Sequence, residues 1–157
     1  MPILTTITKA SGTVTAGTIA NTETITVAGK VYTFQTTLTD VDGNVDIGAD
    51  DDASIDNLVA AINLAAGSGT TYAASMTANP HVTAVADGAS PNVMTVTANV
   101  PGTLGNLVAL AEATTGATLS GAVLASGAGS MDVAMSELKS KAQLNSDVLA
   151  AIEEFLD

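Results

Sequence analysis

A group of acids at positions 40–51 has the most obvious potential for chemistry. In the segment "DVDGNVDIGADD", oxygen-bearing side chains fall at alternating positions and at the twelfth, as calcium ligands do in an EF-hand loop. These residues are Asp40, Asp42, Asn44, Asp46 and Asp51. The sixth position, however, holds valine where the EF-hand needs glycine for its sharp turn, and the twelfth holds Asp instead of Glu. The segment also follows a predicted strand, not a helix. We therefore interpret it as a solvated turn followed by helix-capping acids, with adventitious calcium binding as the alternative.

His81 is the only histidine, and the chain has no cysteine. A transition-metal site needs several nitrogen or sulfur ligands, and a nucleophile needs a neighbouring base. A single His that follows Pro80 into a strand is typical of a strand edge or surface. No glycine pattern followed by lysine has the spacing of a phosphate loop. We therefore expect no catalytic, cofactor-binding or metal-binding residue, no cofactor and no enzyme activity.

The composition indicates one domain with an unusual core. The chain has 157 residues, 46% of them hydrophobic but only 3% aromatic, and no Trp. A chain of this length buries about two-thirds of the surface that it exposes when unfolded. Large rings dominate burial energetics, and here Ala and Val replace them. We expect thin packing, with stability gained from neighbouring copies.

The charge excludes several classes of partner. Sixteen acidic residues face four basic ones, which gives a formal net charge of −12. Binding to nucleic acid or to an anionic membrane surface needs cations, so we expect neither partner. The N-terminus lacks the features of a secretory signal, and no apolar run reaches the length of a spanning helix. We expect synthesis in the cytoplasm in soluble form.

The first part of the chain predicts a hairpin. Residues 1–20 are Thr-rich and read as an N-terminal arm or a first strand. The following segment, "ETITVAGKVYTFQTTLT", alternates apolar and polar residues on both sides of "AGK". Ile25 and Val27 share one face and Thr24 and Thr26 the other. Gly29 supplies the positive φ that a tight hairpin turn needs.

One helix and further strands follow. Residues 53–67 have apolar side chains at spacings of three and four, which predicts a helix with one buried stripe. The stripe is Ile55, Leu58, Val59, Ile62 and Ala66. The preceding Asp51 and Asp52, together with Ser54, suit its N-terminus. We predict strands over residues 81–86 and 93–100, and a last strand within 116–130 that leads into a flexible Gly/Ser/Ala hinge.

The segment 131–157 differs in composition, with two of the four lysines and no glycine. Its apolar residues alternate at spacings of four and three, a heptad seam with one polar member. The seam is Met131, Met135, Leu138, Ala142, Asn145, Leu149, Ile152 and Leu156. The alternative is two short helices broken at residues 145–147, with Asn145 or Ser146 as N-cap and the stripe packed on the chain's own sheet. We favour this alternative because Leu144, Val148 and Phe155 widen the apolar face.

Four motifs give the chain a resemblance to a known module. They are "T-x-T-[IV]-x-G-x-x-Y-T-F" at residues 24–34, "[IV]-x-I-G" at 45–48, "A-x-x-x-x-L-x-x-A-I-N" at 53–63 and "T-V-T-A-x-x-P-G-x-x-G-N" at 95–106. This order resembles a module of structural proteins in tailed-bacteriophage virions, over roughly residues 20–125. The matched positions are turn and core residues, so no site residue is implied.

The resemblance implies a non-enzymatic virion structural protein. The role that we expect is a capsid decoration or head-fibre component in many copies, and the location is the virion, after synthesis in the host cytoplasm. The expected partners are the major capsid protein or other virion proteins and further copies of the chain, with a trimer possible through residues 131–157. The Thr-rich N-terminal arm would dock on the capsid by strand addition. The alternatives are a tail or baseplate accessory protein and a module that binds host-surface glycan.

The expected fold is α+β. We predict a small antiparallel β-sheet of hairpins with one packed α-helix, plus a C-terminal helical segment. Residues 1–20 form the arm or first strand, 21–125 the α+β virion module, and 126–157 the Gly/Ser hinge and C-terminal helix.

Overall fold

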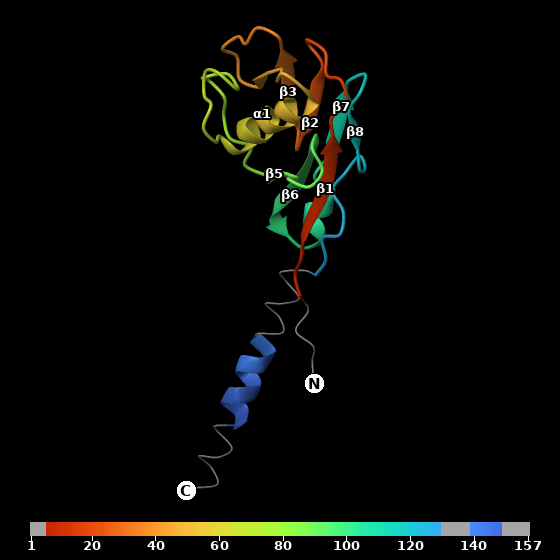
Figure 1. The fold of residues 1–157 in the computed structure, drawn as a ribbon. Coiled ribbons are helices and arrows are strands. Elements are labelled where there is room, and N and C mark those ends of the chain that lie inside the picture. Colours follow the sequence, from red (N-terminus) through yellow and green to blue (C-terminus); the bar gives the residue numbers. More distant parts are fainter. Residues whose placement is uncertain (1–5, 130–138, 149–157) are drawn as a thin grey trace, which may run out of the picture.

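Two four-stranded sheets and one packed helix form the body of the protein (Figure 1). The structure is a computed structural model and describes residues 6–129 and 139–148. The first sheet has the strand order β5–β6–β1–β8 and the second β4–β3–β2–β7. The strands are β1 (Lys9–Thr15), β2 (Thr24–Val27), β3 (Lys30–Gln35), β4 (Asn44–Asp46), β5 (Val82–Ala86), β6 (Val93–Pro101), β7 (Leu110–Ala113) and β8 (Thr118–Leu119). Neighbouring strands are antiparallel, except that β3 and β4 are parallel. The α+β class is thus confirmed, with two sheets in place of the one predicted.

β1 lies inside the first sheet, between β6 and β8. Its register with β6 places Thr13 opposite Thr95, and Val14 pairs with Leu119 of β8 on the other side. The side chains of Ala10 and Val14 are fully buried. Residues 9–15 are therefore a central strand. Both of their edges are used, so they cannot also dock on a partner by strand addition, and that prediction is wrong for these residues.

β2 and β3 form the predicted hairpin. Val27 pairs with Lys30, so Ala28 and Gly29 make a two-residue turn with φ values of 52° and 81°. Positive φ at both central residues is the geometry of a type I′ turn, whose twist matches that of the strands. Ile25 and Val27 are buried on the inner face. The predicted role of Gly29 is confirmed, whereas the left-handed conformation of Ala28 was not foreseen.

The helix α1 (Asp51–Asn63) starts at a side-chain cap. Asp50 Oδ1 accepts a hydrogen bond of 2.8 Å from the backbone N–H of Ala53, and Asp51 and Asp52 lie in the first turn. Leu64, with φ 49°, ends the helix in a left-handed conformation. The helix thus begins at residue 51 and ends at 63, where the sequence predicted 53 and 67.

α1 packs against the strands of the first sheet and against β4 (Figure 1). Three residues of the predicted stripe are buried, namely Ile55, Leu58 and Ile62. At the end of the helix, Asn63 covers the outer edge of β5. Its Nδ2 donates to the Ala84 carbonyl and its Oδ1 accepts from the Ala84 N–H at 3.0 Å. This amide pair takes the place of a neighbouring strand, because it satisfies both backbone groups of Ala84.

One hydrophobic core unites both sheets and the helix. Its largest fully buried side chains are Tyr32, Phe34, Ile25, Ile55, Leu58, Ile62, Met94, Leu124, Val14, Val27, Val45 and Val82. Each such side chain stabilises the fold by about 1.5–3 kcal/mol relative to its exposed state. Two of the four aromatic residues, Tyr32 and Phe34, are therefore placed where burial is most complete.

Residues 124–129 are fixed to the body of the protein. A short 3-10 helix, η1 (Thr103–Leu107), follows β6. The side chain of Asn106 donates to the Gly127 carbonyl at 3.0 Å and accepts from the Gly127 N–H at 2.9 Å. Leu124 is buried, and Ala125 exchanges backbone hydrogen bonds with Ser11. Residues 126–129, predicted as part of a hinge, are thus held by η1 and by Thr8, which directly precedes β1.

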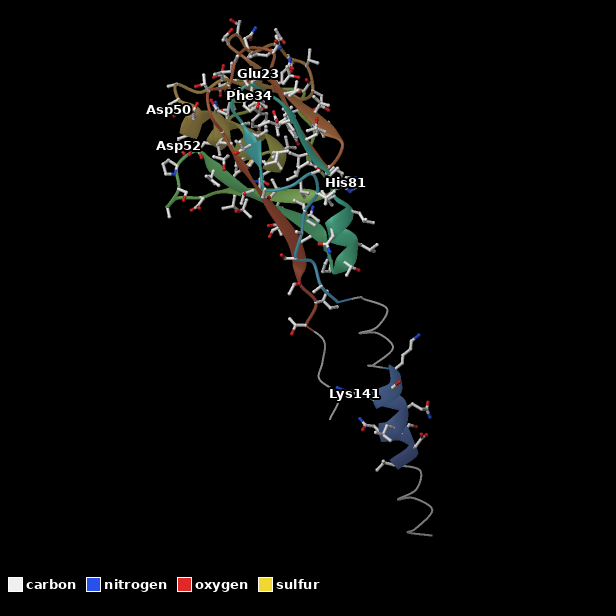
Figure 2. All side chains as sticks on the ribbon, turned by 90° about the vertical axis from the view of Figure 1, so that its right-hand side faces the viewer. Glu23, Phe34, Asp50, Asp52, His81 and Lys141 are labelled. Carbon is white, nitrogen blue, oxygen red and sulfur yellow. The ribbon has the colours of Figure 1, made fainter. Side chains whose placement is uncertain are left out.

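Residues 139–148 are helical and all ten are exposed. This helix lies apart from both sheets in the two views (Figures 1 and 2). It continues through residues 145–147, so the predicted break there is wrong, as is packing on the chain's own sheet for these residues. Of the predicted heptad seam, only Ala142 and Asn145 lie within the described residues.

Candidate functional site

An ion pair joins the hairpin to the loop before β4. Asp42 Oδ1 lies 2.6 Å from Lys30 Nζ and also accepts a hydrogen bond of 2.9 Å from the Thr77 N–H. Asp42 Oδ2 accepts from the Thr77 hydroxyl at 2.7 Å. Lys30 Nζ donates in turn to the Thr77 carbonyl and lies 5.6 Å from the centroid of the Tyr32 ring. The three side chains therefore fix three chain segments to one another.

Hydrogen bonds keep the Asp42 carboxylate ionised. Burial raises its pKa, but the bonds from Lys30 and Thr77 outweigh that effect and lower the pKa from 3.8 to about 2. Asp40 acts in a similar way, because its carboxylate accepts from the Ser75 N–H at 2.7 Å and its pKa is lowered mainly by that bond. Both acids thus hold the segment of residues 74–77.

Two further acids hold turns at the opposite end of the chain's second sheet. Glu23 accepts from the backbone N–H groups of Ala20 at 2.8 Å and Thr115 at 2.7 Å, and its pKa is lowered, most strongly by the bond from Ala20. Glu112 accepts from the hydroxyl and the N–H of Thr114, which lower its pKa too. These carboxylates are structural acceptors.

The structure separates the residues of the predicted calcium loop. Asp40 and Asp42 bind residues 75 and 77, whereas the Asn44 side chain donates to Thr39 and Asp51 lies in α1. The remaining one, Asp46, lies in β4. Within residues 6–129 and 139–148, no three His, Cys, Asp or Glu side chains are grouped to hold a metal ion. The preferred interpretation as a solvated turn needs one correction, because two of the acids are tethers.

His81 stands at the start of β5 on the surface (Figure 2). Its backbone N–H donates to the Asn79 side chain at 3.2 Å. His81 borders a hollow of about 330 Å³ whose other walls are Ala28, Gly29, Leu107, Val108 and Ala109. No other titratable side chain lines this hollow, so its character is that of an apolar depression.

Asn79 is a buried tether that the sequence did not reveal. It is 5% exposed, and its Nδ2 donates to the Val27 carbonyl at 2.9 Å and to the Tyr32 hydroxyl at 3.4 Å. An Asn before a proline reads as a turn residue, and nothing local shows that it reaches a hairpin some fifty positions earlier. Asn79 and Asp42 together hold residues 77–81 against the hairpin.

Several large apolar side chains of the described residues are exposed, and two groups of them could contribute to assembly. One is the helix of residues 139–148, where Leu144 is 62% and Val148 51% exposed. The other, which we call the η1 surface, consists of Val100, Leu104 and Leu107. No helix among the described residues is long and apolar enough to cross a membrane.

Comparison with protein-family models, curated proteins and solved structures found no match to this chain.

Proposed function

We propose that the protein is a non-enzymatic structural component of a tailed-bacteriophage particle. Its role is that of a capsid decoration or head-fibre protein that binds the particle surface in many copies. The virion assignment rests on the sequence motifs at residues 24–34, 45–48, 53–63 and 95–106. The partners in this proposal are the major capsid protein, or another virion protein, and further copies of the chain.

The exposed C-terminal helix is the observation that supports an assembly role. Its described residues, 139–148, pack on neither sheet, yet Leu144 and Val148 lie one turn apart on its surface. Helices shorter than about 12–15 residues are marginal in water, so helices in proteins gain most of their stability from packing. A second helix of the same kind would supply that packing. Leu144 and Val148 lie beside the predicted heptad seam, whose described members are Ala142 and Asn145.

The polar groups of the body support a structural role as well. Asp42, Asp40 and Glu23 accept hydrogen bonds from distant segments, and Glu112 accepts them from Thr114 in its own turn. Their shared function is to hold loops and turns in one conformation. A rigid surface of fixed loops is what a component needs when it binds by shape.

The aromatic side chains argue against the glycan-binding alternative. Tyr32, Phe34 and Tyr72 are at most 3% exposed, and the fourth aromatic residue, Phe155, lies outside the described residues. Sugar-binding surfaces commonly use exposed rings as stacking platforms. The described rings are part of the core instead.

Electron microscopy of purified phage particles tests the proposal. Particles that contain this protein, labelled with an antibody against the body, should show label on the head at many positions. Label confined to the tail would support the tail or baseplate alternative. Particles without the protein would overturn the proposal.

A further inference from the structure

The η1 surface is apolar and exposed. The exposed fraction is 75% for the Leu107 side chain, 66% for Leu104 and 48% for Val100. All three residues lie within eight positions of one another in the sequence. Leu107 also forms one wall of the hollow of about 330 Å³ beside His81. A protruding leucine next to an apolar depression is the shape of a contact surface, since one copy's side chain can enter the other's hollow.

The η1 surface lies where the chain leaves the body toward its C-terminal helix. The Thr103 N–H donates to the Gly129 carbonyl at 3.1 Å, and the Gly102 N–H donates to the Thr8 carbonyl at 2.8 Å. In both views η1 is at the end of the body that is nearer to the helix of residues 139–148 (Figures 1 and 2). Copies that associate through this helix would therefore also bring their η1 surfaces near one another.

The sequence around the η1 surface contains few charged residues. With a net charge of −12, copies of this chain repel one another unless they meet where charge is low. No Asp, Glu, Lys or Arg occurs between Asp87 and Glu112, or between Glu112 and Asp132. The labelled acids Asp50 and Asp52 lie on the opposite side of the body from His81 and η1 (Figure 2). The core of a protein interface is depleted in charged residues. None of the three side chains of the η1 surface is charged, and Lys9, which pairs with Pro101 beside them, has the sign opposite to the net charge.

We propose that the η1 surface packs against a second copy of this chain. The inference rests on the proposed assembly role and names the part of the body that takes part in it. Three side chains bury less area than the roughly 1,200–2,000 Å² of a stable interface, so this contact adds to the one made by the helix. In the assembly, Leu104 and Leu107 of one copy contact the η1 surface of the next.

Sedimentation of full-length variants tests this contact. The double variant Leu104→Asp/Leu107→Asp places two more negative charges at the contact and should weaken assembly at least tenfold. The matched control is Val85→Asp, which adds a charge at a side chain 67% exposed on β5. Val85 pairs with Thr95, six residues and thus about 20 Å along β6 from Pro101. The control should assemble like the wild type. Equal assembly of the double variant and the wild type would overturn the inference.

A second measurement needs no substitution. Hydrogen exchange of the wild-type chain at rising concentration should slow at amides 103–108, together with those of the helix. Protection of the helix alone would overturn the inference but leave the assembly role intact. A wild-type chain that is monomeric at every concentration would overturn both the η1 contact and self-assembly. None of these outcomes bears on the proposed location of the protein on the phage particle, which electron microscopy tests.

Discussion

Lys30 Nζ lies 2.6 Å from Asp42 Oδ1, and this ion pair connects β3 to the loop that precedes β4. Thr77, which is 35 positions beyond Asp42 in the sequence, donates two hydrogen bonds to the same carboxylate. The carboxylate therefore fixes a contact between distant segments. Removal of this carboxylate should therefore lower the stability of the fold.

Asp42→Ala should lower the free energy of unfolding by about 1–2 kcal/mol, since it removes charge-assisted hydrogen bonds at a site that is partly exposed. Urea denaturation measures the change. Asp56→Ala is the control, because Asp56 is exposed on α1 and alanine is the best helix former. Equal stability of the two variants would show that the ion pair is not a stabilising tether.

The pH dependence of stability follows from the same group. The pKa of Asp42 is about 2 in the folded protein and 3.8 without its partners, so the ionised form favours the fold. This contribution is fully present above about pH 5 and is lost as the pH falls through 3.8 toward 2. The difference in stability between the wild type and Asp42→Asn, from thermal unfolding at several pH values, should therefore shrink over this range. A difference that stays constant down to pH 2 would contradict the assignment.

Gly29→Ala should lower the free energy of unfolding by about 1–2 kcal/mol, the cost of a left-handed conformation for an L-residue. The effect is one of backbone alone, because a Cβ atom at Gly29 would meet nothing within 4 Å. Gly88 offers the matched control. Its added Cβ also meets nothing within 4 Å, but Gly88 does not have a positive φ. Gly88→Ala should leave stability unchanged or slightly raised, and an equal loss at both positions would argue against the type I′ turn.

Asn79→Ala should destabilise the protein by about 2 kcal/mol, because it leaves the buried carbonyl of Val27 without its donor. Chemical denaturation gives the value. In Asn99→Ala, the lost bond is to the Pro80 carbonyl at an exposed position, where water replaces the donor. The second variant should lose clearly less stability than the first.

Calcium should leave the melting temperature unchanged. Asp40 and Asp42 already accept hydrogen bonds from Ser75 and Thr77, and Asn44 binds Thr39. Thermal unfolding with millimolar calcium and with a chelator should give the same midpoint. A rise with calcium that Asp42→Asn abolishes would restore the calcium-loop interpretation.

Local patterns were sufficient for the elements whose signals lie within a few residues. Alternation and the glycine at position 29 predicted the β2–β3 hairpin with its correct inner face. The spacing of Ile55, Leu58 and Ile62 predicted the buried face of α1. The end of the helix was missed by four residues, because Leu64 adopts a left-handed conformation that its residue type does not favour.

The C-terminal helix shows the limit of such patterns. A stripe of apolar residues indicates that one face of a helix will be buried, but it does not say by which molecule. The width of the stripe, with Leu144 and Val148, favoured packing on the chain's own sheet. The structure leaves both residues exposed.

The sequence by itself determined that this is an acidic α+β protein with a tight hairpin, one amphipathic helix and a distinct C-terminal segment. Only the tertiary structure decided which strands share hydrogen bonds, since β1 pairs with β6 across some eighty intervening residues. It also decided the roles of the acids. A carboxylate in a sequence looks the same whether it faces water, a metal ion or a backbone N–H. Its role depends on groups such as Thr77 and Ser75, which long-range packing brings to it.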